Sequence, residues 1–582
     1  MKLFGKIPAR GVVWGVAAVV SGLLFRTAFP PFPGGDGSAW FAPVPLFLAA
    51  RLLAPRRAAA FGFAWGVAFR LSALSWFFPL SRNGGPLPIV LLGWAGLSAW
   101  CALFPALALY AQSTFLAPWR GRRAAAREVA RRRDEAAPDS PEELLSEERI
   151  AALKRRSARV EPLFPVVAAV LWAGSETLLS RIGGGFAWYG LGAAQARALP
   201  IAQLAALGGV PLVSAAVAML ADAMAGVVLR ARDGIVRAPG TTRRHFDLTV
   251  ALALLLVAFS WGSSRLRMLR TDADSAERRL VAAAVNPALP CVFQDAETEW
   301  SEGYERLVAD TRLAATAAPD VVVWPETSLW ESMPSPRMEE ALCGEAQSLG
   351  FPIVAGSTET NVPGADEDTV RNSCWMFGSG GASAPYAKRH LVPFGEFIPL
   401  DEHIPILRRL APAGVSCTPG RTPVHFEIGL SAERGGGIAR VSPLICFEDT
   451  VPQTAREAAA GADVLVSLSN DAWFGGSCEA AQHQREAVFR AIENGIPLVR
   501  ASNKGILSAV LPTGEVAPET AGSMMVASVP LAPRRQTRWA RLGDWGFGFP
   551  CAATLAVVLC LGWRGRRHSR RPSPLPPAPS PN

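Results

Sequence analysis

Long uncharged apolar segments constrain this chain more than any other feature of its sequence. Crossing a bilayer takes about 20 residues of apolar helix. Eight segments reach or approach that length, at about 11–29, 38–54, 58–80, 86–117, 163–181, 202–229, 247–264 and 544–563. Because half of the 582 residues are hydrophobic, we expect a bundle of about eight transmembrane helices. The first segment could be a signal peptide, but no small-residue cleavage site follows it, so we interpret it as a retained anchor.

Basic residues indicate the orientation of this bundle, since cytoplasmic loops carry the excess of lysine and arginine. Alternate loops are basic, at Lys2 to Arg10, Arg51 to Arg57, Arg120 to Arg159, and Arg230 to Arg244. We therefore expect both termini in the cytoplasm and residues 266–543 on the outer side of the membrane. Four arginines before the last segment, Arg534, Arg535, Arg538 and Arg541, run against this assignment, but the rule governs short loops better than translocated domains.

The expected organisation follows from these assignments. Residues 1–265 form seven transmembrane helices with a basic cytoplasmic loop at 118–162, residues 266–543 form an extramembrane domain, and residues 544–563 form the last helix. The tail, 564–582, is proline-rich and expected to be disordered. The net charge of +9 is explained by topology, so nucleic acid is not an expected partner.

The extramembrane domain has a different pattern from the bundle. Short apolar or β-branched runs, each ended by a turn or polar residue, alternate with helical patterns; the runs include RRLVAAAVN, PDVVVWPET, FPIVAGST, RVSPLICFED and ADVLVSLSND. Such alternation predicts an α/β domain with a largely covered sheet. Reactive groups in such sheets tend to lie at strand ends.

Three of these strand ends or loops carry candidate reactive groups. Glu326 ends an apolar run, Lys388 and Glu396 lie in a loop marked by proline and glycine, and Cys446 ends another run. A nucleophilic cysteine requires a base for its proton and a cation for the thiolate and oxyanion. The alternative for Cys446 is an ordinary buried thiol, which is the more common kind.

Lys388 is notable because almost all basic residues of this chain are arginines. Only five lysines occur, and two of them, Lys388 and Lys504, lie in the extramembrane domain. A lysine supplies a compact ammonium whose pKa can be tuned, unlike the broad guanidinium. The alternative is an incidental surface charge.

The motifs PDVVVWPETS, YAKRHLVPFGEFIPL, SPLICFEDT and SNDAWFGGS, in this order after a multi-helix region, closely resemble those of apolipoprotein N-acyltransferases. These are bacterial membrane enzymes with a nitrilase-superfamily domain. The resemblance therefore implies that the chain lies in the bacterial inner membrane, with residues 266–543 in the periplasm. The resemblance implies an α-β-β-α sandwich and a catalytic triad of Glu326, Lys388 and Cys446. It also implies that Glu396 and Glu448 build and orient the pocket.

The resemblance further implies a two-step reaction without a cofactor. Cys446 takes an acyl chain from a membrane phospholipid, and the thioester passes it to the α-amino group of a diacylglyceryl-cysteine at a lipoprotein N-terminus. Two departures from the family pattern occur: Phe447 replaces a common tyrosine, and RRLVAAAVNPALP lacks a glutamine-asparagine pattern. The second departure leaves Trp300 only a weak candidate for the tryptophan that relatives carry after it.

Several supporting residues have two interpretations each. Asn470 and Trp473 either belong to a loop over the pocket, where aromatic side chains meet acyl chains, or form a structural turn. His483 could be a base, but its amphipathic helix favours a structural role. Arg490 and Glu493, three residues apart on that helix, are expected to form a structural ion pair.

No metal or cofactor is expected, because the six histidines show no ligand spacing and no CxxC pair occurs. A disulfide among the periplasmic cysteines is allowed by the compartment but cannot be assigned. Two other functions use the same features: a membrane-tethered amidase that hydrolyses its thioester, and a non-enzymatic protein that binds lipid or lipoprotein. The second would depend on intramembrane charges, chiefly Arg26, Arg70 and Glu176.

Overall fold

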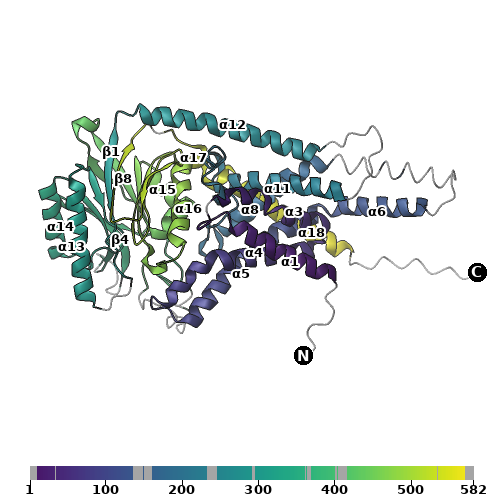
Figure 1. The fold of residues 1–582 in the computed structure, drawn as a ribbon, viewed down its shortest axis with the longest axis horizontal. Helices are drawn as coiled ribbons and strands as arrows, with labels where there is room; N and C mark the ends of the chain where they lie inside the picture. The colour runs from purple at the N-terminus through teal and green to yellow at the C-terminus, as the bar shows by residue number, and fades with distance from the viewer. Residues whose placement is uncertain are drawn as a thin grey trace, which may run out of the picture.

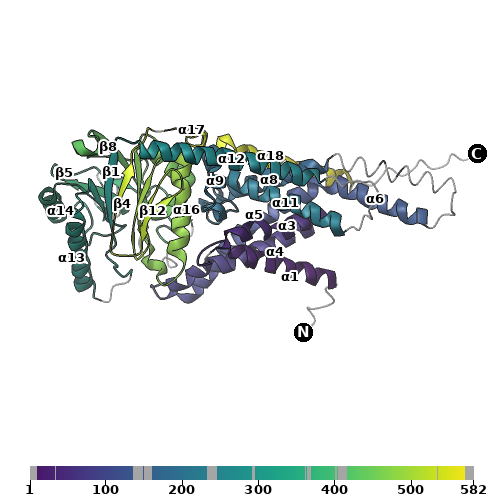
Figure 2. The same ribbon diagram turned by 45° about the horizontal axis from the view of Figure 1, so that its top comes forward.

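A computed structural model shows two parts: a bundle of long helices at one end and a two-sheet domain at the other (Figures 1 and 2). The structure describes residues 9–32, 34–134, 149, 152, 160–232, 245–291, 295–360, 362, 369–399, 403, 416–533 and 535–569. Most of the basic loop expected at 118–162 and most of the proline-rich tail therefore lie outside the described residues. The described beginning of that loop is helical, in α6 (Ala117–Asp134).

The bundle contains the helices that the apolar segments predicted, but two of those segments are divided into shorter helices. Among the described residues, six helical segments are long and apolar enough to cross a membrane: Pro55–Ser81, Leu87–Phe115, Glu161–Leu179, Val210–Arg232, Phe246–Asp274 and Arg538–Leu561. They include α4 (Pro55–Ala73), α5 (Leu87–Phe115), α8 (Phe164–Leu179), α11 (Val210–Arg232), α12 (Phe246–Asp274) and α18 (Gly548–Ser569). The first segment forms α1 (Ala9–Arg26), a shorter apolar helix. The chain is thus a multi-pass membrane protein.

Two of the apolar segments are not continuous helices. Segment 38–54 is divided into α2 (Ser38–Phe41) and α3 (Val44–Leu52), with Pro43 between them. A nine-residue helix is only about 14 Å long, so α3 is too short to cross a bilayer alone. Segment 202–229 begins with the short helix α10 (Ala205–Gly208) before α11, because Gly209 has a φ of 70° and Pro211 follows it.

A buried polar network joins the helices far from the two-sheet domain. Arg51 of α3 donates to Asp222 of α11 at 3.0 Å, and Gln112 of α5 donates to the same carboxylate at 2.8 Å. Arg230 binds Asp247 of α12 at 2.7 Å. Buried charges are stable when they are paired in this way. The sequence interpretation, which emphasised Arg26, Arg70 and Glu176, missed this network.

The other part of the chain folds into two sheets. The first has the order β13-β1-β2-β3-β4-β5, with β6 also paired to β4: Met524–Pro530, Arg279–Val285, Val321–Val323, Ile353–Glu359, Arg371–Gly378, Gly381–Ala382 and Tyr386–Ala387. The second has the order β12-β11-β10-β9-β8-β7: Val516–Thr520, Leu507–Val510, Leu498–Asn503, Val464–Asn470, Ile438–Ile445 and Phe426–Gly429. In each sheet three parallel strands, β1–β3 and β8–β10, are flanked by antiparallel ones.

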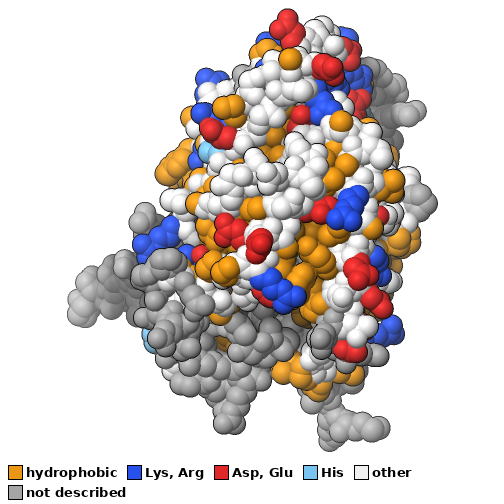
Figure 3. All heavy atoms as spheres, turned by 90° about the vertical axis from the view of Figure 1, so that its left-hand side faces the viewer, with side chains coloured by type: hydrophobic (Ala, Val, Ile, Leu, Met, Phe, Trp, Pro, Cys, Tyr) orange, Lys and Arg blue, Asp and Glu red, His pale blue; other side chains and the backbone are white. Residues whose placement is uncertain are grey.

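The sheets pack face to face between two pairs of helices. One apolar cluster contains Ala282 and Val323 of the first sheet together with Val441 and Val466 of the second. Helices α13 (Ala296–Ala315) and α14 (Pro336–Leu349) cover the first sheet, and their side of the molecule carries interspersed acidic and basic side chains (Figure 3). Helices α15 (Pro452–Ala459) and α16 (Glu479–Asn494) cover the second sheet and face the bundle (Figure 1). The expected α-β-β-α sandwich, a nitrilase-like domain, is confirmed.

Candidate active site

Cys446 lies in a tight turn at the carboxyl end of a buried strand. It follows β8 directly and begins the short helical turn η8 (Cys446–Thr450) with a φ of 51°. Such a backbone conformation in a residue other than glycine costs roughly 1–3 kcal/mol and is typical of functional sites. The residue keeps some exposed surface, but its sulfur is deep enough that burial raises the pKa of the thiol to about 12.

Glu326 approaches this sulfur from the first sheet. It follows β2, is 7% exposed, and its carboxylate lies close enough to the Cys446 thiol that each group affects the pKa of the other. Asn372 donates to Glu326 Oε1 at 2.7 Å. Gly356 of β3 permits this arrangement, because a Cβ atom there would come within 2.7 Å of the Glu326 backbone.

Lys388 completes the group from the segment after β6. It is 1% exposed, and its Nζ lies 2.7 Å from Glu396 Oε1 and 3.4 Å from Glu326 Oε1. Burial alone would lower the pKa of the ammonium, but Glu396, Glu326 and Cys446 raise it well above its usual value. Lys388 is therefore a permanent cation next to the sulfur.

The two carboxylates around Lys388 differ in their readiness to take a proton. Burial raises the pKa of Glu326, with a further increase from the charge of Glu396. Burial would also raise the pKa of Glu396, but the Lys388 ammonium outweighs it and lowers that pKa. Glu396 thus stays ionised and holds the ammonium, whereas Glu326 is suited to accept the thiol proton.

Asn372 is a site residue that the sequence interpretation missed. Its side-chain amide lies between the two carboxylates and donates to Glu326 Oε1 at 2.7 Å and to Glu396 Oε1 at 2.9 Å. Asparagine is depleted in strands, yet Asn372 is the second residue of β4. The sequence pattern predicts no strand there, so it offers no signal for this residue.

Glu448 is the first of two acids that follow Cys446 and Phe447 in the sequence. It is fully buried; its Oε1 accepts from the backbone N–H groups of Arg389 at 2.7 Å and His390 at 3.0 Å, and its Oε2 accepts from the Tyr386 hydroxyl at 2.7 Å and the Ile445 N–H at 2.8 Å. The carboxylate therefore fixes the turn of Cys446 to the segment that carries Lys388.

Asp449 is the second of these acids, and the sequence interpretation gave it no role. It is fully buried and accepts from His483 Nε2 at 2.8 Å, Ser467 Oγ at 2.7 Å and Arg500 Nε at 3.3 Å. These partners lie in α16, β9 and β10. Asp449 therefore ties the turn to the opposite side from Glu448, and no local sequence pattern links such distant residues.

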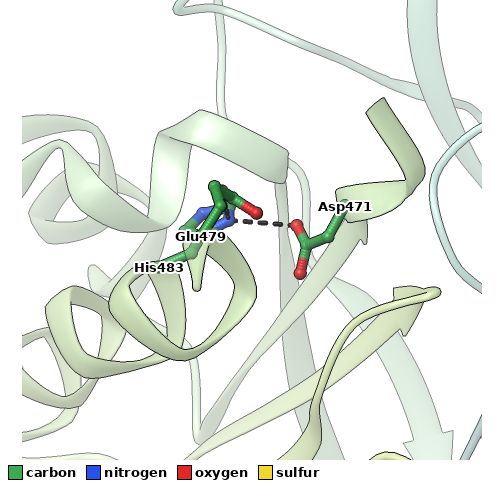
Figure 4. A group of neighbouring side chains, drawn as sticks. All are labelled: Asp471, Glu479 and His483. Atoms are coloured by element: carbon green, nitrogen blue, oxygen red, sulfur yellow. Dashed lines mark hydrogen bonds and ion pairs between the residues drawn. The ribbon is translucent and has the colours of Figure 1, made fainter. Parts of the chain in front are cut away.

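Asp471, Glu479 and His483 lie close enough together to hold a metal ion by geometry, and their side chains converge in Figure 4. A guanidinium already occupies this group, because Arg500 Nη2 lies 2.8 Å from His483 Nδ1 and 3.1 Å from Asp471 Oδ2. Burial would lower the pKa of His483, but Asp449 and other partners raise it well above its usual value. The geometry favours an internal ion-pair network in which His483 has a structural role.

Aromatic side chains from both parts of the molecule meet beside the candidate nucleophile. The Phe447 ring stacks against Phe186, with ring centroids 6.4 Å apart, and against Trp188 at 6.5 Å. Phe186 and Trp188 belong to the segment between α8 and α11, and Trp188 also contacts Trp76 at 5.3 Å. Phe447 thus joins the turn of Cys446 to the bundle by apolar contact.

The remaining candidates lie around this group rather than in it. Asn470 Oδ1 accepts from the Ala472 N–H at 3.3 Å and from Asn503 at 2.9 Å, which is a turn-forming role. Trp473 is partly exposed, and its carbonyl accepts from Asn83 at 2.7 Å.

Three further expectations fall elsewhere in the domain. Trp300 lies in α13. The buried ion pair between Arg490 and Glu493 is present, at 2.8 Å. The cysteines of the described residues are free thiols.

Comparison with known proteins covers both parts. The family profile described as carbon-nitrogen hydrolase matches residues 282–538, and the profile described as apolipoprotein N-acyltransferase N-terminal domain matches residues 21–128 and 148–223. An apolipoprotein N-acyltransferase of Geobacter metallireducens is 30% identical over 576 residues, covering 96% of this chain and 97% of the relative. The chain belongs to the apolipoprotein N-acyltransferase family.

A second member of the apolipoprotein N-acyltransferase family, from Chromobacterium violaceum, is 29% identical over 585 residues. The match covers 96% of this chain and 96% of the relative. Among solved structures, an amidase from Nesterenkonia sp. is 18% identical, with a TM-score of 0.31, over 44% of this chain and 92% of the amidase.

Proposed function

We propose that this chain transfers an acyl chain from a membrane phospholipid to the α-amino group of the diacylglyceryl-cysteine at the N-terminus of a lipoprotein. Its family supports an acyltransferase with a catalytic cysteine. The observation that carries the proposal is the convergence of Glu326 and Lys388 on the Cys446 sulfur, beside aromatic side chains supplied by the bundle.

In the first step, the Cys446 sulfur attacks the ester carbonyl carbon of a phospholipid while Glu326 accepts the thiol proton. Concerted transfer suits this site, because a thiol with a pKa of about 12 is not ionised at neutral pH. The Lys388 ammonium stabilises the negative charge on the carbonyl oxygen. The ester C–O bond then breaks, the leaving alkoxide takes the proton from Glu326, and a lysophospholipid departs from the thioester.

In the second step, the α-amino group of the lipoprotein attacks the thioester carbonyl. Glu326 accepts a proton from the amine, the C–S bond breaks, and the sulfur regains a proton as the amide forms. Glu396 contributes by holding Lys388, with 2.7 Å between Nζ and Oε1. Each half-reaction therefore returns the carboxylates to their starting charge.

Water is the competing acceptor, and it defines the alternative of an amidase that hydrolyses its thioester. The stacking of Phe447 against Phe186 and Trp188 supports acyl transfer, because it lines the site with apolar groups from the membrane part. Apolar surroundings favour an acyl chain and a lipid-borne amine over bulk water. We propose that these rings contact the acyl chain.

We propose that the chain lies in the bacterial inner membrane, with residues 266–543 in the periplasm and both termini in the cytoplasm. Helices α1 and α18 support this orientation, since the ends at Ala9 and Ser569 lie at the end of the molecule opposite the two-sheet domain (Figure 1). Helix α6 extends from the same end.

The decisive experiment is intact-mass analysis of the full chain isolated from membranes. Incubation with a phospholipid should add the mass of one acyl chain to Cys446, and a diacylglyceryl lipopeptide should remove it and gain an acyl amide. Release of the adduct as free fatty acid in the presence of the lipopeptide would favour the amidase. A chain with no adduct that still acylates the lipopeptide would overturn the proposal.

A further inference from the structure

The basic segment before α18 is the feature that the topology and the proposed reaction leave unexplained. It contains Arg535, Arg538 and Arg541 in the described residues, whereas loops on the outer side of a membrane usually carry few basic residues. The cluster lies on the same side of the bundle as the two-sheet domain, where α17 (Arg538–Leu542) precedes α18 (Figure 1).

One face of this segment is anchored to the protein. Thr537 caps α17 by accepting from the Ala540 N–H at 2.9 Å, and its hydroxyl donates to the Glu493 carbonyl of α16. Trp539 is 1% exposed and packs against Gly209. The segment is therefore held in a fixed orientation on the bundle.

The opposite face combines charge with exposed apolar surface. Arg538 and Arg541 are exposed, Leu542 is 44% exposed, and Trp545 is 76% exposed. Arg538, Arg541 and Leu542 share one side of α17, because they are three and four residues apart, and Trp545 lies in the turn that follows, Gly543–Gly546. Arginine beside exposed tryptophan and leucine is typical of segments that lie in the headgroup region of a membrane.

The two arginines of this face have no acidic partner among the described residues. The neighbouring acids are already used, because Arg535 binds Asp272 at 2.5 Å and Arg181 Nε binds Asp544 at 2.7 Å. Within the part of the chain that the structure describes, neither Arg538 nor Arg541 forms an ion pair, and Arg538 donates only to the Gly546 carbonyl, at 3.3 Å.

The depth of the face in the membrane follows from α18. That helix begins at Gly548, three positions after Trp545. The face therefore lies where the apolar span begins, at the level of lipid phosphates. A lipid phosphate at this level would accept from both guanidinium groups, and the exposed Leu542 and Trp545 would meet the upper part of the acyl chains.

We propose that the face formed by Arg538, Arg541, Leu542 and Trp545 binds the headgroup of an anionic phospholipid at the end of α18 beside the catalytic domain. A lipid with net negative charge satisfies the two uncompensated arginines, whereas a zwitterionic headgroup offsets its own phosphate. The face is independent of the proposed acyl transfer, since it requires only that α18 is embedded in a bilayer.

The test measures lipid binding to the full chain in detergent micelles by native mass spectrometry. Wild type should bind phosphatidylglycerol more tightly than phosphatidylcholine. The double substitution Arg538→Gln and Arg541→Gln should weaken phosphatidylglycerol binding by about fivefold for each arginine lost, and leave phosphatidylcholine binding unchanged. The matched control is Arg337→Gln in α14, an arginine whose side chain is 78% exposed at the other end of the molecule.

Three results would overturn the proposal. The first is phosphatidylglycerol binding within twofold of wild type in the double variant. The second is an equal loss of both lipids, which indicates a general apolar contact. The third is retention of phosphatidylglycerol with loss of an acidic lipopeptide, which makes the partner a peptide. If the double variant is unstable, Arg541→Lys and Arg541→Gln separate charge from folding, because only the glutamine variant should lose affinity.

Discussion

Helices α13 and α16 cover equivalent outer faces of the two sheets, yet they face different surroundings. On α13, the Arg312 side chain is 63% exposed and binds Glu345 of α14 at 2.7 Å. On α16, most residues are buried, and they include the charged Glu479, Arg485, Glu486, Arg490 and Glu493. The same layer of the sandwich is a solvated surface on one side and an interior interface on the other.

The buried charges of α16 show how the bundle and the catalytic domain are joined. Glu486 Oε1 accepts from the Tyr189 N–H at 2.9 Å, and Glu493 Oε1 accepts from the Val210 N–H at 3.1 Å. Arg485 donates to the carbonyl of Ala28 at 2.8 Å. Charged groups that bond to buried backbone require the partner to be present, so the bundle completes the fold of this face.

The largest effect should come from removing the Cys446 thiol, which lies next to Phe447 and the aromatic side chains of the bundle. Cys446→Ala should lower acyl transfer by at least about 10³-fold, because the covalent intermediate is lost. The matched control is Cys343→Ala, a thiol of α14 on the solvent-facing layer, which should keep wild-type activity. Lipopeptide acylation followed by mass spectrometry measures both. Equal activities would remove the chemical distinction between the two sides.

Breaking the buried ion pair of α16 should have the next largest effect. Arg490 binds Glu493 at 2.8 Å and the Thr450 carbonyl at 3.0 Å. Arg490→Ala leaves a buried carboxylate without its cation, and we expect a loss of about 3 kcal/mol in the free energy of unfolding. Burial raises the pKa of Glu493 to about 7, so protonation should reduce the loss at low pH. Chemical denaturation in detergent at pH 5 and pH 8 measures the difference.

A smaller effect should appear in the pH dependence of kcat/KM. In the proposed mechanism Glu326 acts as a base only when it is ionised, and its pKa is raised by burial and by the charge of Glu396. Activity should therefore fall on the acidic side with a midpoint above about 4.3, the ordinary glutamate value. Glu396→Gln removes one source of the increase and should move that midpoint to lower pH.

The matched control for the pH profile is Glu345→Gln on α14, the solvent-facing counterpart. It should leave the midpoint where it is in wild type. A midpoint that rises in Glu396→Gln, or that moves equally in both variants, would contradict the assignment of the acidic limb to Glu326.

The smallest effect should come from the solvent-facing ion pair. Arg312→Ala removes the contact with Glu345, but the arginine is mostly exposed and screened by water, so we expect a loss in the free energy of unfolding well below that of Arg490→Ala. The measurement is the same denaturation used for Arg490→Ala. A loss as large as that of the buried pair would remove the contrast between the two helices.

The central residues of the candidate site were accessible from the sequence because each lies at the end of an apolar run. Glu326 and Cys446 follow β2 and β8, and strand ends are where an α/β domain exposes reactive groups. Lys388 was distinguished by the scarcity of lysine. Local chemistry and strand boundaries were sufficient for these three.

Asn372, Asp449 and Arg500 were not accessible in the same way. Their roles depend on contacts across two sheets and α16, as in the 2.8 Å contact from Asp449 to His483. The helical periodicity of α16 indicated one apolar face and one solvated face. It could not indicate that the polar face packs on membrane helices. The break at Pro43 in segment 38–54 shows the same limit, since hydropathy measures composition rather than helix continuity.

The hydrogen bonds from Tyr189 and Val210 to the carboxylates of α16 have a practical consequence for biochemistry. A water-soluble fragment limited to residues 266–543 would expose those carboxylates and the aromatic flank of the nucleophile to solvent. Such a fragment would be a poor stand-in for inhibitor discovery. Compounds should be screened on the whole chain in a lipid environment, where Phe186 and Trp188 of the bundle are present beside the turn of Cys446.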